Sequence, residues 1–353
     1  MRRSKLMAWA VGLPLAVFSS AAFAQTPGEA SSGTGESPRG ISTGTPPTDF
    51  TPRAVPVIED PSVLDQIGRE ILDEEATRER FGATALSRDG TVTTIEASDE
   101  MVRAILGAGA PGAPQPQDDA RSRFVGPQDL RQQVRDPGSY PVTAVGLLYS
   151  TFADGGSSCS ATLIGPSTVI TAAHCIYDHA EGWPSNIEYV PAMMDEATHP
   201  YGVWEFDTAY VLNSYITRYR GVYGEVVPYD LAVVTLLTPV GDELGWLGFG
   251  PSEEIQGFDA TILSYPGDKP FGTMWHSNCD VSLAPEYADD LIFVHFCQTY
   301  AGSSGGSLFA HYPSQDEHRI YGINVAEVQG DDGYNIAVRM NLPYFQWVVE
   351  RWK

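Results

Sequence analysis

The sequence predicts an all-β fold, a barrel or a sandwich, for the part of the chain that begins near residue 124. The apolar runs there are short and rich in β-branched and aromatic residues, turn residues separate them, and no long helical pattern lies between them. Many short strands without intervening helices are typical of barrels and sandwiches. The predicted strands are 144–149, 160–164, 168–171, 186–190, 210–212, 231–236, 260–264, 291–296, 307–310 and 319–325.

The first 24 residues have the parts of a signal peptide in the right order. A basic start, with Lys5 as its last charge, precedes an apolar run at 8–18, and small residues follow up to Ala24. This pattern predicts cleavage after Ala24 and a secreted or periplasmic protein. Neither this run nor any later one reaches the roughly 18 apolar residues that a membrane helix needs, so no membrane span is predicted.

Residues 25–123 are predicted to form a detachable N-terminal region. Gly, Ser, Thr and Pro dominate residues 25–56, which predicts disorder because so few large apolar residues cannot offset the entropy of ordering. A Pro- and Gly-rich linker at 107–116 separates the region from the β domain. Between these two stretches we expect a helical pattern at 60–82, a short strand at 91–95 and a short helix at 101–106.

The chain is predicted to end in an amphipathic helix over residues 342–352. Asn341 is a suitable N-cap, because its side chain accepts a hydrogen bond from a free N–H of the first turn. Apolar residues at helical spacing share one face, which we expect to pack on the β structure. They are Leu342, Phe345, Val349 and Trp352.

The charge of the chain argues against two classes of partner. Its formal net charge is −24, and from residue 124 onward 28 acidic residues face nine basic ones, so this part alone carries −19. Binding to nucleic acid or to anionic membranes needs clustered Lys and Arg. We therefore expect neither partner.

Four cysteines in an exported chain predict two disulfide bonds. Three pairings are possible, and each pairing of sequence neighbours would contribute about 3 kcal/mol in the chain-entropy model. A zinc site is disfavoured, because the sequence has no closely spaced Cys or His pair and no His-Glu-x-x-His motif. The cysteines are Cys159, Cys175, Cys279 and Cys297.

A serine in the stretch Gly302-Ser303-Ser304-Gly305-Gly306 is a candidate nucleophile. A serine hydroxyl reacts poorly at neutral pH unless a base takes its proton and donors receive the oxyanion. Glycines allow the sharp turn that aims backbone N–H groups at such an oxyanion. By itself, however, a Gly/Ser cluster is more often an ordinary turn.

Two residues upstream give the serine its partners. His174 ends an apolar strand, and Asp230 precedes a strongly apolar strand, where a buried carboxylate is costly unless it is paired. The order His, Asp, Ser fits one known arrangement of a catalytic triad. It argues against a lipase or esterase, in which the histidine follows the serine.

Three motifs resemble those of chymotrypsin-fold serine endopeptidases: Thr-Ala-Ala-His174-Cys175, Tyr-Asp230-Leu-Ala and Gly-x-Ser304-Gly-Gly. Residues 228–248 are more similar to the secreted bacterial branch that includes the glutamyl endopeptidases. The resemblance extends from Phe124 to the C-terminus.

The resemblance implies a fold of two six-stranded antiparallel β-barrels, at about 140–240 and 250–340, with the active site between them. It also implies a signal peptide at 1–24, a propeptide at 25–123 and a protease domain at 124–353, with cleavage between Arg123 and Phe124. The disulfides would be Cys159–Cys175 and Cys279–Cys297. We expect a monomer that acts on protein or peptide substrates without a cofactor or metal ion.

The resemblance also implies the roles of the site residues. Ser304 would be the nucleophile, His174 the general base and then acid, and Asp230 the residue that orients the histidine ring. The amides of Gly302 and Ser304 would form the oxyanion hole. Ser303 occupies the position of the trypsin-like aspartate that pairs with a new N-terminus, so that activation switch is not expected.

Two alternatives to a glutamyl-specific enzyme remain open at this point. A catalytically inactive binding module of the same fold is one, although the presence of all three triad residues favours an enzyme. The other is an enzyme of different specificity. Gln298 and Thr299 should form the base of the primary pocket. Asn324 occupies the place of the histidine that binds the substrate glutamate in the glutamyl endopeptidases. With Glu327 near the rim, we expect a polar or uncharged residue before the scissile bond. We expect Ser307, at the start of the next strand, to be structural.

Overall fold

The computed structural model describes residues 50–66, 73–107, 128–251, 254–283, 291–312, 316–329 and 333–353. The predicted signal peptide, its cleavage after Ala24, the bond between Arg123 and Phe124, and all but the first residue of the predicted linker lie outside these residues. Strands dominate the described part, in which no helix is both long and apolar enough to cross a membrane.

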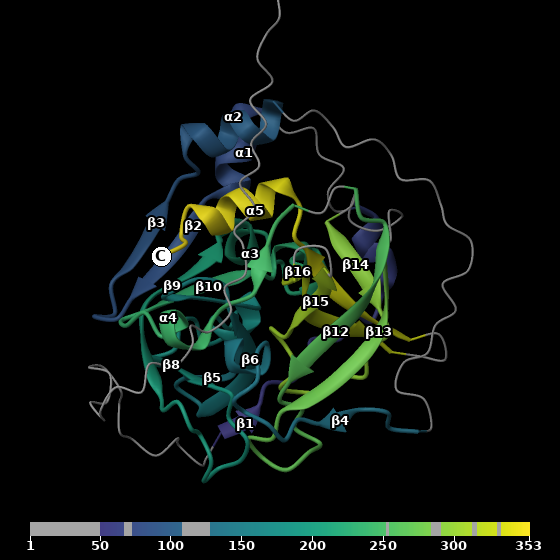
Figure 1. Ribbon diagram of the computed structural model, residues 1–353. Coiled ribbons are helices and arrows are strands. Elements are labelled where there is room, and N and C mark those ends of the chain that lie inside the picture. Colours follow the sequence, from purple (N-terminus) through teal and green to yellow (C-terminus); the bar gives the residue numbers. More distant parts are fainter. Residues whose placement is uncertain are drawn as a thin grey trace, which may run out of the picture.

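The first barrel is a closed ring of six antiparallel strands, drawn mainly in teal in Figure 1. The strand order is β10-β7-β6-β5-β8-β9, and β9 pairs with β10 to close the ring. The strands are β5 (Val145–Thr151), β6 (Gly156–Leu163), β7 (Thr168–Thr171), β8 (Asn186–Pro191), β9 (Trp204–Leu212) and β10 (Ala232–Leu236).

The second barrel closes in the same way, with the order β16-β15-β12-β13-β14-β17 and a pairing of β17 with β16. Two short strands lie on its edges: β11 (Gly248–Phe249) on β16 and β4 (Gln132–Gln133) on β13. The barrel strands are β12 (Gly257–Ser264), β13 (Trp275–Leu283), β14 (Ile292–His295), β15 (Ser307–Tyr312), β16 (Glu317–Val328) and β17 (Tyr334–Arg339).

The predicted fold of two six-stranded barrels with a C-terminal helix is confirmed. Every predicted strand overlaps an observed one, but two strands of the barrels, β13 and β17, were not predicted, and neither were the short strands β1, β2, β4 and β11. The residues of β13 are mostly polar and partly exposed, so they show no apolar run. Its backbone instead finds partners on both edges, in β12 and β14, which only the assembled barrel provides.

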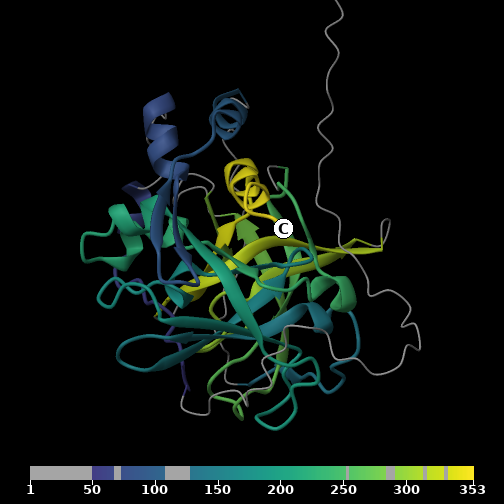
Figure 2. The ribbon, with the colours of Figure 1, turned by 90° about the vertical axis from the view of Figure 1, so that its left-hand side faces the viewer.

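The N-terminal region packs against the first barrel. β2 (Ala83–Ser87) pairs with β9, and β3 (Val92–Ile95) pairs with β2, so the hairpin extends the barrel's sheet (Figure 2). The other elements of this region are β1 (Phe50–Pro52), η1 (Pro61–Gln66), α1 (Glu74–Phe81) and α2 (Asp99–Gly107).

The prediction of disorder up to residue 56 is wrong for residues 50–56. Phe50 packs its ring 4.3 Å from that of Tyr149, measured between ring centroids, and β1 pairs in parallel with β6. The composition of this stretch predicts disorder because it has few apolar residues. Those residues are nevertheless ordered, because they contact the β domain, which is distant in sequence.

The C-terminal helix α5 (Leu342–Val349) begins as predicted, since the Asn341 side chain accepts a hydrogen bond of 3.1 Å from the N–H of Tyr344. It ends three residues before the predicted end at 352. The predicted buried face is confirmed for Phe345 and, in part, for Leu342, and is wrong for Val349 and Trp352. Val349 is 41% exposed and Trp352 is 40% exposed. The helix lies between the barrels and α2, so Tyr344, Trp347 and Val348 are buried together with Phe345.

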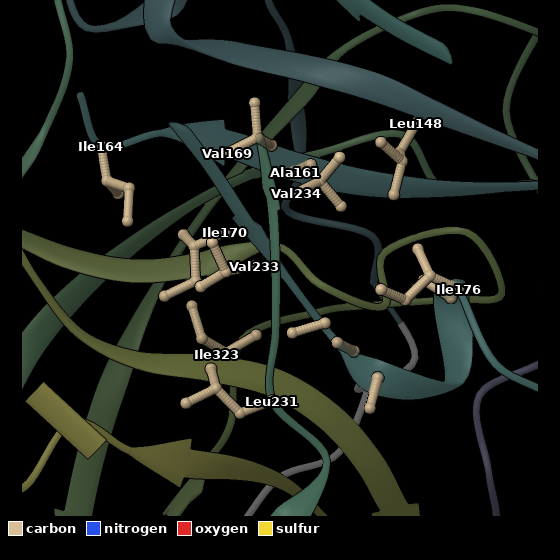
Figure 3. Close-up of a cluster of buried hydrophobic side chains, with 14 of the residues drawn as sticks. Leu148, Ala161, Ile164, Val169, Ile170, Ile176, Leu231, Val233, Val234 and Ile323 are labelled. Carbon is tan, nitrogen blue, oxygen red and sulfur yellow. The ribbon is translucent and has the colours of Figure 1, made fainter. Parts of the chain in front are cut away.

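Aliphatic side chains from both barrels form one large core. Figure 3 shows Ile323 of β16 beside Ile170, Val233 and Leu231 of the first barrel, and all four are fully buried. Each such side chain stabilises the fold by about 1.5–3 kcal/mol relative to exposure. The short helices that connect the strands are η2 (Val142–Ala144), η3 (Ala173–Cys175), α3 (Asn213–Thr217), η4 (Tyr223–Glu225), η5 (Val227–Tyr229) and α4 (Gly241–Leu244).

Candidate active site

The pairing of β7 with β10 brings His174 and Asp230 together. Ala232 of β10 lies opposite Thr171 of β7. His174 follows Thr171 by three residues, and Asp230 precedes Ala232 by two. The Nδ1 atom of His174 lies 2.6 Å from Oδ2 of Asp230, and the His174 backbone N–H donates to Oδ1 at 2.9 Å. Because a carboxylate only accepts, Nδ1 carries the proton and Nε2 is free to act as a base.

Tyr223 is a third partner of this pair that the sequence did not indicate. Its hydroxyl donates to Oδ2 of Asp230 and lies 3.5 Å from the carbonyl oxygen of Val325. Burial, and next the negative charge of Asp230, raise the pKa of Tyr223 well above its ordinary value. The hydroxyl therefore stays protonated and donates to the carboxylate.

Ser304 lies in a loop whose shape depends on glycines with positive φ. Gly302 has φ +89° and Gly305 has φ +79°. A Cβ added at Gly302 would lie 2.5 Å from the carbonyl oxygen of Tyr265, and one at Gly305 would lie 2.1 Å from Oγ1 of Thr171. Gly305 thus packs against the end of β7, three residues before His174, so the loop that carries Ser304 lies beside the strand end that leads to His174.

The two groups that would react are buried. Ser304 is 0% exposed and His174 is 4% exposed. Within the described part of the chain, neither Oγ of Ser304 nor Nε2 of His174 has a hydrogen-bond partner. The N–H of Gly302, a predicted oxyanion donor, instead donates to the carbonyl oxygen of Arg53 at 2.8 Å.

Gln298 and Thr299 precede the Ser304 loop and are both buried. The Gln298 amide is held by the chain segment before β4: Oε1 accepts from the N–H of Leu130 at 2.6 Å, and Nε2 donates to the carbonyl of Gln128 at 2.9 Å. The Thr299 hydroxyl has no hydrogen-bond partner among the described residues.

The Asn324 side chain is bound on both sides. Nδ2 donates to the carbonyl of Ser303 at 3.1 Å, and Oδ1 lies 3.0 Å from Nε2 of His295. His295 must therefore donate from Nε2. Burial lowers the pKa of His295 to about 4, so the ring is neutral at pH 7. Asn324 thus holds the Ser304 loop, a role that its place in the sequence did not indicate.

The neighbouring serines have structural contacts. Oγ of Ser303 accepts from Oγ of Ser264 at 3.0 Å and from the N–H of Tyr300 at 3.3 Å. Ser307 begins β15, and its hydroxyl donates to Oγ1 of Thr162 at 2.9 Å.

The structure joins Cys159 to Cys175 and Cys279 to Cys297. The first bond ties η3, which carries His174, to β6. Two groups of three possible metal ligands occur in the described residues, and each combines one of these cysteine pairs with one histidine, His174 or His295. Disulfide sulfurs are not thiolates, so each group offers a single ligand, too few for a metal site.

Comparisons with known proteins agree with this geometry. Residues 159–313 match the model of the trypsin-like peptidase domain, and this span includes His174, Asp230 and Ser304. Residues 159–313 therefore resemble a trypsin-like peptidase domain, and the two closed barrels have the chymotrypsin fold.

More particularly, the chain resembles the glutamyl endopeptidases. The glutamyl endopeptidase of Bacillus licheniformis is 28% identical over 221 residues, which are 62% of this chain and 65% of the relative. That of Staphylococcus epidermidis is 25% identical over 236 residues, or 61% of this chain and 70% of the relative. A solved structure of a Glu endopeptidase in complex with MPD has a TM-score of 0.53 at 23% identity, and the match covers 64% of this chain and 97% of that one.

One relative has a name of another class. The extracellular metalloprotease of Bacillus subtilis is 25% identical over 221 residues, 62% of this chain and 66% of the relative. The chain thus spans just under two thirds of this protein and of the Bacillus licheniformis relative. The described residues offer no set of metal ligands that fits this relative's name.

Proposed function

We propose that the protein is a secreted serine endopeptidase that hydrolyses peptide bonds through an acyl-enzyme. The observation that carries the proposal is the buried pair of His174 and Asp230, with both carboxylate oxygens directed at the histidine. The Gly-rich loop of Ser304 packs against the same strand end.

In this mechanism Ser304 attacks the carbonyl carbon of the scissile bond while Nε2 of His174 takes the hydroxyl proton. The proton then passes to the leaving amine, and water hydrolyses the acyl-enzyme by the same steps in reverse order. Asp230 holds the ring with Nδ1 protonated and stabilises the imidazolium that forms. The N–H groups of Gly302 and Ser304 stabilise the oxyanion.

The proposed substrate is a protein or peptide with a polar or uncharged residue before the scissile bond. Gln298 carries no charge that would select Lys or Arg, and Asn324 carries none that would select Glu. Charge-assisted hydrogen bonds are roughly twice as strong as neutral ones, so strict preference for glutamate needs a cation that Asn324 does not supply. Substrates that differ only at this residue test the proposal, and a preference for Glu above about tenfold would contradict it.

The decisive experiment compares two adjacent serines. Ser304→Ala should lower turnover by on the order of 10⁴ to 10⁶, whereas Ser303→Ala should cost much less. A fluorophosphonate probe should label the processed wild-type enzyme and the Ser303→Ala variant but not Ser304→Ala. Equal losses in both variants would refute the assignment of the nucleophile. Absence of labelling in the wild-type enzyme would favour an inactive binding module.

A further inference from the structure

Residues 50–66 lie across the candidate active site. The N–H of Arg53 donates to the carbonyl of Ser158 at 2.8 Å, and the carbonyl of Arg53 accepts from the N–H of Gly302 at 2.8 Å. Pro52 packs on the same turn, since a Cβ added at Gly302 would lie 3.2 Å from that of Pro52. The segment therefore uses a proposed oxyanion donor.

The same segment continues onto the second barrel. Glu327 donates its N–H to the carbonyl of Pro56 at 3.0 Å and accepts from the N–H of Ile58 at 2.9 Å. Ile58 is 3% exposed and Leu64 is 0% exposed, and both belong to the main core. The segment is thus bound to both barrels, at Ser158 and Gly302 on one side and at Glu327 on the other.

The segment runs in the direction opposite to that of a substrate. In the proposed function, the residue before the scissile bond enters the pocket at Gln298 and Thr299 in the second barrel. A substrate must then place its N-terminal side on the second barrel and its C-terminal side on the first. In residues 50–58 the N-terminal part pairs with β6 of the first barrel, and Val57 forms a bridge with Glu327 of the second.

The side chain of Arg53 agrees with this direction. Its carbonyl occupies the position expected for a scissile carbonyl, but its guanidinium does not enter the pocket. The guanidinium pairs with Asp178 and lies 4.9 Å from the ring centroid of Phe152, both in the first barrel. Because the chain continues from Arg53 toward the second barrel, the amide nitrogen of Ala54 does not lie on the first-barrel side, where the leaving group of a substrate would lie.

We propose that residues 50–66 are an inhibitor that binds the active site backwards and is not cleaved. The inference rests on the proposed function and adds a partner to that site: the chain's own N-terminal segment, first within the intact chain and then, after processing, as a separate peptide. Cleavage in the 108–127 region alone would not remove the segment from the site.

The first test measures how fast a fluorophosphonate probe labels Ser304 in the intact chain, read by intact mass so that processed molecules are excluded. Ile58→Asp places a charge in a buried contact of the segment, and Val92→Asp places the same charge on β3, outside the segment, at a side chain that is 52% exposed. Ile58→Asp should increase the labelling rate at least about tenfold, and Val92→Asp should leave it unchanged.

A second variant guards against misfolding. Arg53→Pro removes the N–H that bonds Ser158 and the side chain that pairs with Asp178, and should also speed labelling about tenfold. Circular dichroism checks that each variant is folded. Labelling of the intact wild-type chain as fast as that of processed enzyme separated from the N-terminal fragment, or folded variants no faster than wild type, would overturn the inhibitor. Processed enzyme that has been separated from the N-terminal fragment and is still not labelled would instead refute the proposed function, and the inference with it.

The third test addresses direction. A synthetic peptide of residues 50–64 is added to the processed enzyme recovered from culture. We expect competitive inhibition of peptide hydrolysis, weakened at least about tenfold when the peptide carries Arg53→Ala, and an intact peptide by mass spectrometry. Hydrolysis between Arg53 and Ala54 would show that the segment binds as a substrate, and absence of inhibition would show that it does not bind by itself.

Discussion

At the scale of single residues, the candidate site depends on the hydrogen bonds that its buried carboxylate accepts, one of which comes from outside the triad. Asp230 is fully buried and accepts from the N–H and Nδ1 of His174 and from the hydroxyl of Tyr223. A buried carboxylate is tolerated only when its oxygens are satisfied in this way. Tyr223 is therefore a positioning residue for Asp230.

Removing this hydroxyl should affect turnover more than binding. We expect Tyr223→Phe to lower kcat about tenfold with KM nearly unchanged, because a hydrogen bond to a charged group contributes about 1.5–3 kcal/mol and part of this acts on the imidazolium. Tyr189→Phe is a matched control, since it also removes a buried hydroxyl, which donates to the carbonyl of Ala144 at 3.0 Å. The control should lose stability but keep its kcat. Equal kcat losses in both variants would mean that Tyr223 is merely structural.

A pH effect on stability is expected from His295. Its pKa is lowered by burial to about 4 in the folded protein, from an ordinary value of 6.5, so the unfolded chain binds the proton first as the pH falls. The contribution to stability is complete above pH 6.5 and decreases as the pH falls toward 4, by on the order of 3 kcal/mol. Unfolding by denaturant between pH 4 and 8, with Ser304→Ala present to prevent self-digestion, measures it.

His295→Gln is the control for this effect, because an amide N–H replaces the Nε2 donor to Asn324 without a titrating ring. The free energy of unfolding of the wild-type protein should fall relative to the variant below pH 6.5. Parallel curves would contradict the assignment.

At the scale of elements, the loop of Ser304 is held by contacts at its glycines. Gly302→Ala should destabilise the fold by about 1–3 kcal/mol and lower activity by at least about a hundredfold, because its Cβ meets the carbonyl of Tyr265 and shifts an oxyanion donor. Gly90 has a similar φ of +85° but has open space around the added Cβ. Gly90→Ala should therefore show the effect of backbone strain without a steric clash. Urea unfolding measures the loss of stability in each variant, and activity assays measure the loss of activity. Equal effects in both variants would contradict the argument.

At the scale of the whole molecule, the N-terminal region is part of the sheet of the first barrel. β2 pairs with β9 over five residues, from Ala83 opposite Leu212 to Ser87 opposite Thr208. Together with β1 and the buried Ile58 and Leu64, this gives the region contacts that a cut in the chain does not break.

We therefore expect the two fragments of a cut chain to stay together. The Ser304→Ala chain, cut after Arg123 by added trypsin, should elute from a sizing column as one complex and separate only in denaturant. N-terminal sequencing of the secreted wild-type form checks the proposed cut itself, which predicts a start at Phe124. Fragments that separate in native buffer would contradict the role of β2, and a start before residue 110 would contradict the cleavage site.

The sequence by itself determined the class of the fold, because short apolar runs separated by turn residues have a local signature. It also indicated the site, since His174, Asp230 and Ser304 each lie in a distinctive local pattern, at a strand end, a strand start and a glycine turn. The cap at Asn341 was predictable for the same reason: the hydrogen bond of a cap joins residues three apart.

Only the tertiary structure decided what depends on partners far apart in the chain. The strand β13 is polar and forms because β12 and β14 bond its edges; Tyr223 matters because it meets Asp230; and Asn324 holds the Ser304 loop rather than standing free in a pocket. Disorder was predicted for residues 50–56 because their composition offers little local apolar contact, yet they form hydrogen bonds with Ser158, Gly302 and Glu327. Such hydrogen bonds cannot be predicted from local sequence patterns, because the two residues that form each bond are far apart in the chain and only the folded structure places them in contact.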